Sequence, residues 1–417
     1  MSEFHVCGGA RLRGEISVQG AKNAVLPILA ATVISGGENY LKGCPRLRDV
    51  DKTVSILRHL GARTRWEKDG LWVDTRTVDR CDIPEDLMRE MRSSVIFLGA
   101  VSARCRRARI SMPGGCDIGL RPIDLHLKAL RDMGVTLTES GGAIRSDASN
   151  LQGGEVHLAF PSVGATENAM LQAAGTRHET VITNAAREPE IRDLADYLEK
   201  IGMSVEGAGT DTVTLRGAKE YHGAEHTVIP DRIAAATYLC AAMMTGGEVT
   251  LHNAREDHLK AVVVHLRECG GEIRADQNSI TLRAPQRMRA AETVVTGPYP
   301  GFPTDAQSLF LAMLTQAEGS SMITETVFEN RFRNVEYLCR MGADIRLSGR
   351  VAVVSGKTPL VGAHVAAPDL RGGASLVLAA LCAEGESVIE NGYHLDRGYE
   401  NFAGALSCLG ANVKRLE

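Results

Sequence analysis

One short pattern returns six times along this chain, each time at the end of a helix-like segment. The copies read HLGA, DMGV, KIGM, ECGG, RMGA and CLGA, and their glycines lie 68 to 73 residues apart. Glycine at this place commonly lets a helix end in a left-handed conformation. Spacing this regular over 417 residues predicts six copies of one structural repeat. The six glycines are Gly61, Gly134, Gly202, Gly270, Gly342 and Gly410.

Each copy carries the same order of hydrophobic patterns. In the fourth, the apolar helix pattern AAATYLCAAMM (234–244) is followed by a Gly-rich turn and the strand pattern GEVTLHNA (247–254). A second helix pattern then leads to the glycine that recurs every 68 to 73 residues, and two strand patterns end the copy. The strand segments alternate apolar and polar residues, whereas the helical ones repeat every 3.6 residues. We therefore predict an α/β fold built from β-α-β-α-β-β repeats.

The two ends of the chain indicate how the repeats are grouped. The sixth copy stops at VKRLE before its last strand, and the N-terminal FHVCGGARLRGEISVQ resembles the strand–turn–strand that ends other copies. This pattern predicts two lobes of three repeats each. Residues 22–229 form the first lobe, and residues 1–21 plus 230–417 form the second, whose last repeat is completed by an N-terminal hairpin. A cleft between two such lobes is a favoured ligand site, so we expect the active site there.

Composition excludes several classes of partner. The net charge of −4 gives no general attraction to nucleic acid or an anionic membrane, and 4% aromatic residues argue against a stacking surface for single strands. Apolar stretches such as AVLPILAATVI are too short to cross a bilayer, and the N-terminus lacks a signal-peptide core. The ten cysteines are scattered without CxxC spacing, which indicates neither a disulfide framework nor a zinc site. We expect a cytoplasmic protein without a metal.

The stretch SMPGGCDIGLRPIDLH (111–126) places Cys116 in a Gly-rich loop, with Arg121, Asp124 and His126 behind it. A cysteine used for packing usually lies in an apolar run, and this one does not. Cationic neighbours lower a thiol pKa and favour the nucleophilic thiolate. The residues alone leave two interpretations open: a reactive thiol on a lid that closes over substrate, or an incidental cysteine in a flexible connection.

Motifs spread along the whole chain, from about Phe4 to Arg415, resemble the UDP-N-acetylglucosamine 1-carboxyvinyltransferases within the enolpyruvyl transferase family. The most specific element is PGGC followed by GLRPIDLH, which the sister enzymes of the shikimate pathway lack. The resemblance implies two similar lobes, each with three repeats in a pseudo-threefold arrangement, the inside-out α/β barrel of enolpyruvyl transferases. The other motifs are QGAKNAVLPILAA, MRSSVIFLGA, PSVGATENAM, NAAREPEI, PDRIAAATYL, FPTDAQ, ITETVFENRF, DLRGGASLVLAAL and YHLDRGYE.

The reaction implied by the resemblance joins the enolpyruvyl group of phosphoenolpyruvate to the 3-hydroxyl of UDP-N-acetylglucosamine and releases phosphate. It proceeds by addition and elimination through a tetrahedral ketal, is the first committed step of peptidoglycan precursor synthesis, and is the target of fosfomycin. No cofactor is implied. Such a scheme needs an acid–base group on each side of the reacting carbon and cations for highly charged substrates.

The resemblance also implies roles for residues that match the family motifs. Cys116 would protonate C3 of phosphoenolpyruvate and form a covalent adduct with it, and Asp305 would take the proton of the sugar hydroxyl. Lys22 and Arg397 complete the implied catalytic set. Phosphoenolpyruvate would be bound by Lys22, Asn23, Arg121 and Arg397. The nucleotide sugar would be bound by Arg92, Arg121, Pro122, Ile123, Asp124, Leu125, Ser162, Val163, Gly164, Asp305 and Val327, with the diphosphate on the backbone N–H groups of 162–164.

Other interpretations of these residues remain open from the sequence. Lys22 also fits a solvated lysine, and Asp305 also fits a helix N-cap. Arg371 is expected to face the cleft, and His126 to pack or to support Arg121. Phe160-Pro161 stands where some relatives carry a lysine, which leaves the charge around the diphosphate uncertain.

Two rival functions are weighed against the implied one. The same fold could act on shikimate 3-phosphate, against which the PGGC–GLRPIDLH block argues. The chain could also be a non-catalytic sugar-nucleotide sensor, against which the filled acid–base positions argue. Two small-molecule substrates, no nucleic acid and no membrane are the expected partners.

Overall fold

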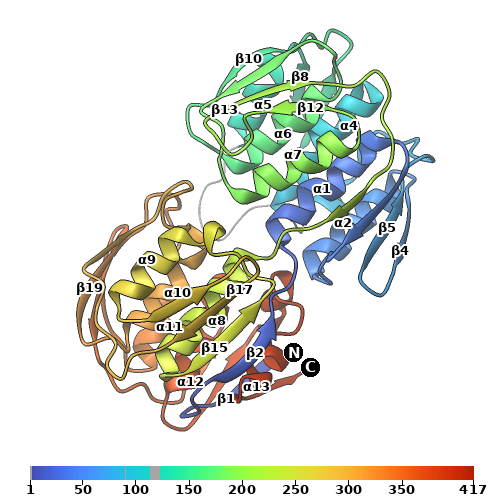
Figure 1. The fold of residues 1–417 in the computed structure, drawn as a ribbon. Coiled ribbons are helices and arrows are strands. Elements are labelled where there is room, and N and C mark those ends of the chain that lie inside the picture. The colour runs from blue at the N-terminus through green and yellow to red at the C-terminus, as the bar shows by residue number, and fades with distance from the viewer. Residues whose placement is uncertain (1, 90, 113–122) are drawn as a thin grey trace. The chain divides into compact units, whose positions relative to one another are not determined.

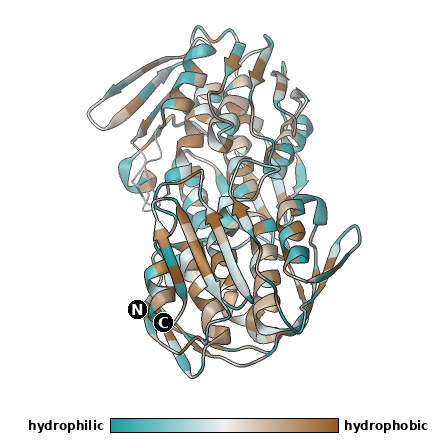
Figure 2. Ribbon diagram, turned by 90° about the vertical axis from the view of Figure 1, so that its left-hand side faces the viewer, coloured by the Kyte–Doolittle hydropathy of each residue, from teal (hydrophilic) through white to brown (hydrophobic). Residues whose placement is uncertain are grey.

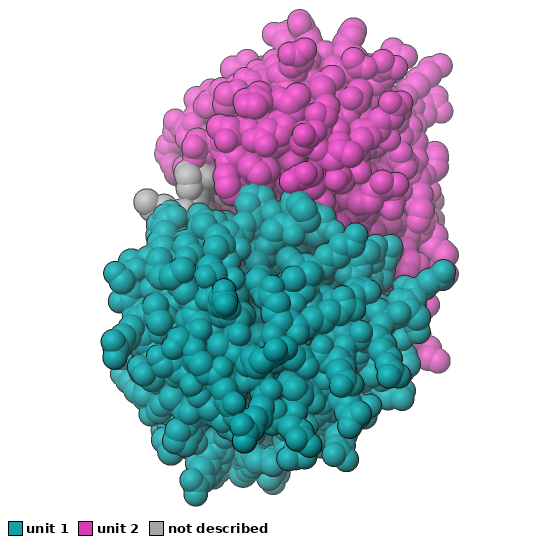
Figure 3. Space-filling model, turned by 60° about the vertical axis from the view of Figure 1, so that its left-hand side comes forward, with its two compact units in different colours: residues 1–19, 117–120, 230–417 teal, residues 20–116, 121–229 magenta. Residues whose placement is uncertain are grey.

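The computed structural model describes residues 2–89, 91–112 and 123–417. Cys116, Arg121 and Pro122, and most of the expected lid, therefore lie outside the described residues. The chain forms two compact units (Figure 3): unit 1 contains residues of 1–19 and 230–417, and unit 2 contains residues of 20–112 and 123–229. The main chain passes from one unit to the other after Gln19 and again after Ile229.

Six four-stranded sheets share one strand order among the described residues (Figure 1). In four of the six sheets the edge strand that precedes a central helix is parallel to the strand that follows that helix. In the other two, the parallel edge strand precedes the first central helix of the other unit in the chain. The next two strands are antiparallel. The predicted α/β fold of six β-α-β-α-β-β repeats is confirmed. The sheets remain separate, so the described residues form no closed barrel of strands.

Unit 2 holds the first three repeats, whose sheets have the orders β14-β3-β5-β4, β6-β7-β9-β8 and β10-β11-β13-β12. Its strands are β3 (Glu38–Lys42), β4 (Arg63–Trp66), β5 (Gly70–Asp74), β6 (Asp82–Ile83), β7 (Arg107–Ser111), β8 (Thr136–Ser140), β9 (Ala143–Asp147), β10 (Gly154–His157), β11 (Thr180–Thr183), β12 (Ser204–Glu206), β13 (Thr212–Arg216) and β14 (Glu225–Thr227). Its helices are α1 (Lys22–Ser35), α2 (Arg48–His59), α3 (Glu85–Met88), α4 (Phe97–Cys105), α5 (Asp124–Asp132), α6 (Val163–Ala173) and α7 (Pro189–Lys200), with a 3₁₀ turn at Arg92–Ile96.

Unit 1 holds the other three repeats, with sheet orders β16-β17-β15-β2, β18-β19-β21-β20 and β22-β23-β1-β24. Its strands are β1 (Glu3–Cys7), β2 (Arg13–Ser17), β15 (Glu248–His252), β16 (Glu272–Ala275), β17 (Ser279–Arg283), β18 (Thr293–Val295), β19 (Gly319–Thr324), β20 (Asp344–Ser348), β21 (Val351–Gly356), β22 (His364–Ala366), β23 (Glu386–Glu390) and β24 (Asn412–Leu416). Its helices are α8 (Arg232–Thr245), α9 (Lys260–Glu268), α10 (Thr304–Leu314), α11 (Val335–Arg340), α12 (Leu370–Cys382) and α13 (Phe402–Cys408), with 3₁₀ turns at Glu256–His258 and Gly392–Arg397.

The N-terminal strands do not form the expected hairpin with each other. β1 lies between β23 and β24, where Phe4 is opposite both Ile389 and Arg415. β2 instead runs parallel to β15, with Ile16 opposite Leu251. β1 therefore completes the sixth repeat and β2 supplies the first strand of the fourth. Both sheets lack one strand of their own, and this is why the two short strands separate.

Three apolar helices form the centre of each unit, α1, α4 and α6 in unit 2 and α8, α10 and α12 in unit 1, and each set packs together. Helix α8 shows the reason: every residue from Ile233 to Met244 is buried, as expected for a helix that is apolar on all sides. The outer helices are amphipathic instead, and the strands mix hydrophobic and hydrophilic residues (Figure 2). In the described part of the chain, no helix has both the length and the apolar character needed to span a bilayer.

Candidate active site

The predicted site residues recur at one position of the repeat, the second residue of a central helix. Asn23 holds this position in α1, Gly164 in α6, Asp305 in α10 and Arg371 in α12. The first turn of a helix presents unpaired backbone N–H groups and a partial positive charge. The repeat therefore places chemically different side chains at equivalent helix starts.

In unit 1, the Asp305 carboxylate is held by two buried arginines. Arg331 Nη2 donates to Asp305 Oδ1 at 2.6 Å, and Arg371 Nη2 lies 3.3 Å from Oδ2. Both arginine side chains are 3% exposed, whereas that of Asp305 is 27% exposed. Asp305 is thus the solvent-facing end of a buried ion network. The N-cap role is not the one it adopts, because Pro303 occupies that position of α10.

Arg371 remains charged although it is fully enclosed. Burial lowers its pKa, but the neighbouring Asp305 carboxylate, followed by Tyr399 and Asp231, raises the pKa above the usual value overall. Its Nη1 lies 3.4 Å from the Tyr399 hydroxyl, and its backbone N–H donates to the Asp369 side chain that caps α12. A guanidinium held this firmly provides a fixed positive charge behind Asp305.

Val327 and Arg397 also lie in unit 1. The backbone N–H of Val327 donates to the Glu325 carboxylate at 2.8 Å, which fixes the turn after β19. Arg397 ends the 3₁₀ turn Gly392–Arg397. The residues that follow are tied to Gln19, whose amide donates to the Gly398 carbonyl at 3.0 Å and accepts from the Glu400 N–H at 2.9 Å.

In unit 2, Lys22 begins α1 and is paired with a carboxylate. Its Nζ lies 3.5 Å from Asp49 Oδ2, and the two side chains are 13% and 5% exposed. A lysine in the first helical turn is unfavourable against the helix dipole, and Asp49 on the neighbouring helix α2 offsets this. The ammonium group is therefore a fixed, mostly buried charge and not a solvated one.

The start of α6 adjoins a buried neutral histidine. Burial, followed by the positive charge of Arg92, lowers the pKa of His126 to about 4. Asn168 Nδ2 lies 3.1 Å from His126 Nδ1, while Asn168 Oδ1 accepts the Gly99 N–H at 2.7 Å. Because the Asn168 amide nitrogen is a donor, Nδ1 is an acceptor and Nε2 carries the proton.

Gly164 permits this close approach of the histidine to α6. A Cβ atom at Gly164 would lie 3.0 Å from His126 Cε1 and 3.3 Å from Nε2. Ser162 caps the helix by accepting the Ala165 N–H at 3.4 Å. Phe160, which stands where some relatives have a lysine, is 42% exposed and carries no charge.

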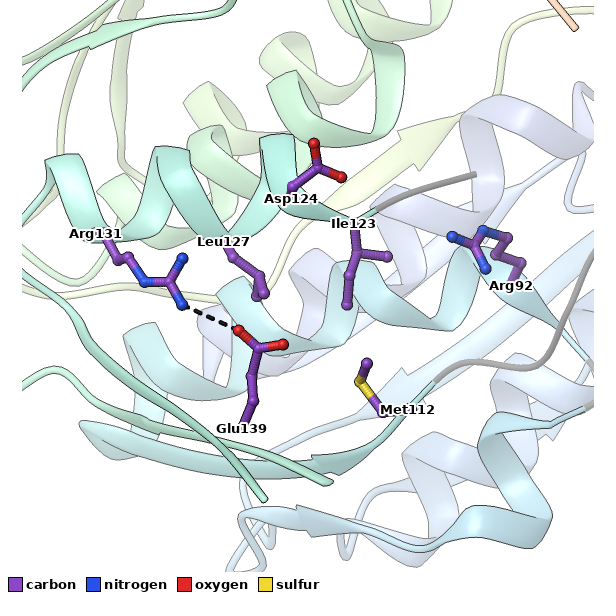
Figure 4. Close-up of a pocket in the computed structure, with 7 residues that line it drawn as sticks. All are labelled: Arg92, Met112, Ile123, Asp124, Leu127, Arg131 and Glu139. Atoms are coloured by element: carbon purple, nitrogen blue, oxygen red, sulfur yellow. Dashed lines mark hydrogen bonds and ion pairs between the residues drawn. The ribbon is translucent and has the colours of Figure 1, made fainter. Parts of the chain in front are cut away.

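A hollow of about 360 Å³ in unit 2 brings together three of the predicted nucleotide-sugar residues, Arg92, Ile123 and Asp124 (Figure 4). Arg131 and Glu139 form an ion pair of 3.1 Å across one side of it. Leu125 does not line the hollow and instead packs, partly buried, against the core of unit 2. Among the described residues, the hollow is lined by Arg92, Met112, Ile123, Asp124, Leu127, Arg131 and Glu139.

The sequence reasoning missed several residues that hold the predicted ones in place: Asp49, Asn168, Glu325 and Arg331. Glu325 and Arg331 stand inside the quoted motif ITETVFENRF, so the motif carried the signal. Their contacts with the start of α10 join segments more than 20 residues apart, which local patterns do not reveal. The roles assigned to the individual site residues remain predictions.

Comparison with known proteins identifies the family. The family described as EPSP synthase (3-phosphoshikimate 1-carboxyvinyltransferase) matches residues 6–406. The chain belongs to this family. The resemblance to enolpyruvyl transferases inferred from the motifs is thereby confirmed.

Relatives of the enolpyruvyl transferase chain match it over its full length. UDP-N-acetylglucosamine 1-carboxyvinyltransferase 2 of Caldanaerobacter subterraneus subsp. tengcongensis is 50% identical and covers 100% of both chains. The protein named UDP-N-acetylglucosamine 1-carboxyvinyltransferase in Geobacter metallireducens is 44% identical, again over 100% of both.

Solved structures of the family share the fold. The crystal structure of the enolpyruvyl transferase NikO from Streptomyces tendae has a TM-score of 0.90 and 25% identity, covering 99% of this chain and 98% of that one. An EPSP synthase from Acinetobacter baumannii has a TM-score of 0.75 and 18% identity, covering 100% of both.

Proposed function

We propose that this chain transfers the enolpyruvyl group of phosphoenolpyruvate to the 3-hydroxyl of UDP-N-acetylglucosamine, the first committed step of peptidoglycan precursor synthesis. The observation that carries the proposal is the relative named UDP-N-acetylglucosamine 1-carboxyvinyltransferase 2, 50% identical across the whole of both chains. The solved EPSP synthase from Acinetobacter baumannii is only 18% identical. The PGGC–GLRPIDLH block points the same way, against shikimate 3-phosphate as the acceptor.

The reaction balances between the two substrates. In the addition, the sugar oxygen bonds to C2 of phosphoenolpyruvate, the hydroxyl proton passes to a base, and C3 gains a proton. In the elimination, C3 loses a proton and the bond from C2 to the phosphate oxygen breaks, so phosphate leaves. No electron acceptor or further group enters the balance, and the chemistry calls for no cofactor.

Asp305 is the base in this proposal, and its surroundings support that role. The carboxylate is reachable by solvent, while Arg331 and Arg371 restrain both of its oxygens from the buried side. Removing rotational freedom from a base is worth several kcal/mol of the barrier in well-oriented reactions.

The remaining predicted residues bind the substrates or transfer a proton. In this proposal, phosphoenolpyruvate is bound by Lys22, Asn23, Arg121 and Arg397, and its C3 is protonated by Cys116. Arg92, with the segment Arg121–Leu125, binds the nucleotide, and the N-terminus of α6 binds the diphosphate. The neutral His126 suits a site for an anion, because its Nε2–H donates without requiring a second proton. We place the reaction in the cytoplasm, where both small-molecule substrates are made.

Phosphate release is the direct test. Purified protein should release phosphate only when phosphoenolpyruvate and UDP-N-acetylglucosamine are both present, and shikimate 3-phosphate should not replace the sugar nucleotide. Release with phosphoenolpyruvate and shikimate 3-phosphate, but not with phosphoenolpyruvate and the sugar nucleotide, would assign the chain to the other branch. Binding without turnover would make it a sensor.

Cys116→Ser tests the assigned thiol. We expect it to lose most turnover and to resist alkylation by fosfomycin, whereas Cys81→Ser, at a partly buried position directly before β6, should behave as wild type. Intact-mass analysis with phosphoenolpyruvate, followed by peptide mapping, locates any adduct. A fully active and still alkylated Cys116→Ser protein would contradict the assignment.

A further inference from the structure

One residue breaks the repeat in unit 1. The position directly after the second strand of a sheet is left-handed in four of the six sheets: Gly43 (φ 66°), Asn184 (φ 53°), Asn253 (φ 50°) and Asn391 (φ 58°). Glycine and asparagine are the residues that adopt this conformation most readily. After β19, however, the position is occupied by Glu325, which does not have a positive φ. The fold of the repeat therefore does not by itself require glutamate there.

The Glu325 carboxylate is fully buried and receives hydrogen bonds at both oxygens. Its side chain is 1% exposed. Oε1 accepts from the Thr296 hydroxyl at 3.0 Å and from the backbone N–H groups of Val327 at 2.8 Å and Phe328 at 3.1 Å. Oε2 accepts from the Thr304 hydroxyl at 2.9 Å. Burying a carboxylate is costly unless it is hydrogen-bonded in this way.

These contacts join the two predicted sugar-side residues through one group. Thr304 is the first residue of α10 and directly precedes Asp305, while Val327 is the predicted sugar contact. Arg331 contacts the same two segments. Its Nε donates to the Thr304 carbonyl at 3.2 Å, its Nη2 to Asp305 at 2.6 Å, and its guanidinium lies 5.7 Å from the centre of the Phe328 ring.

We propose that Glu325 is a positioning residue for the transfer reaction: it holds the first turn of α10 and the Val327 turn in one geometry, so that Asp305 faces the hydroxyl of the bound sugar. This rests on the proposed function. Glu325 itself is shielded from solvent and acts through Thr304 and the Val327–Phe328 backbone. A base displaced by about 1 Å loses on the order of 100-fold in rate.

Two substitutions of different severity test the proposal. Glu325→Asn installs the residue found at this position in three other sheets, and Thr304→Val removes only the hydroxyl that bonds Oε2, with little change of shape. We expect Glu325→Asn to lower kcat on the order of 100-fold and Thr304→Val about 10-fold. KM for phosphoenolpyruvate should change little in both, because the residues predicted to bind it belong to other segments.

Matched controls separate positioning from folding. Thr304→Ser keeps the hydroxyl and should restore most of kcat, and Asn253→Gly changes the equivalent position after β15 and should leave kcat as in wild type. Thermal unfolding and the stoichiometry of fosfomycin labelling measure the fraction of folded protein. If Glu325→Asn does not fold, the Thr304 pair decides the question.

Wild-type kcat in folded Thr304→Val would overturn the positioning role, as would equal kcat in Thr304→Val and Thr304→Ser. An equal fall of kcat in Asn253→Gly would also overturn it, because the effect would then belong to the repeat and not to Glu325. Absence of phosphate release in the wild-type protein is a different result: it contradicts the proposed function itself.

Discussion

Helices α10 in unit 1 and α6 in unit 2 occupy equivalent places in their repeats and begin in opposite ways. α10 carries the acidic Asp305 in its first turn, tied to two buried arginines, whereas α6 has no acidic residue in its first turn and begins with Val163-Gly164. The neutral His126 packs against Gly164.

The two helices differ in whether their own first turn carries a negative charge. A helix N-terminus attracts negative charge. α10 supplies that charge from its own chain and so presents a carboxylate able to accept a proton. α6 has no acidic residue in its first turn. In the proposed function, equivalent helix starts therefore serve two purposes: the start of α10 carries the base, and the start of α6 binds an anion.

The largest expected effect is on the α10 side. Asp305→Ala should bind both substrates yet lose on the order of 100- to 10,000-fold in kcat, because a positioned general base contributes that much. Steady-state kinetics with a separate measurement of UDP-N-acetylglucosamine binding checks it, with Asp344→Ala on β20 as the matched control. Normal turnover by Asp305→Ala would remove the contrast between the two helix starts.

The next effect is the pH dependence of stability on the α6 side. In the folded chain the pKa of His126 is about 4, below the usual histidine value of about 6.5, so the unfolded chain binds the extra proton first as pH falls. The stability contributed by neutral His126 is therefore fully present above pH 6.5 and is lost as pH falls towards 4, by about 3 kcal/mol.

Urea unfolding of wild type and His126→Gln between pH 7 and pH 4 measures this loss. Glutamine does not titrate, so the variant should lose about 3 kcal/mol less than wild type over this range. His222→Gln, at an exposed position, should follow the wild-type profile. If the free energy of unfolding depends on pH equally in wild type and in His126→Gln, then the neutral state of His126 does not contribute to the stability of the α6 start.

The smallest effect is expected from Gly164→Ala. The added Cβ lies 3.0 Å from the His126 ring, so the histidine must shift, at a cost of about 1 kcal/mol. KM for UDP-N-acetylglucosamine should rise several-fold while kcat stays near wild type, the reverse of Asp305→Ala. Gly297→Ala, where nothing lies within 4 Å of the added atom, is the control. A fall in kcat without a change in KM would contradict an anion-binding role for α6.

Much of the fold could be predicted from the sequence because its signals are local. The glycine spacing, the apolar helices and the alternating strands depend on neighbours a few residues apart, and they define the six repeats and the α/β class. The motifs defined the family. Side-chain identity also restricts chemistry in advance: a thiol in a polar loop, arginines for anions and an aspartate for a base.

Only the tertiary structure decided which distant segments meet. β1 and β2 are neighbours in the sequence and join different sheets, because each fills a gap left by a strand missing elsewhere in unit 1. Likewise, Glu325 and Arg331 reach Asp305 and its neighbour only after β19 and α10 have packed. Periodicity records which face of an element is buried, whereas the choice of partner across that face depends on shape and hydrogen bonding in the assembled core.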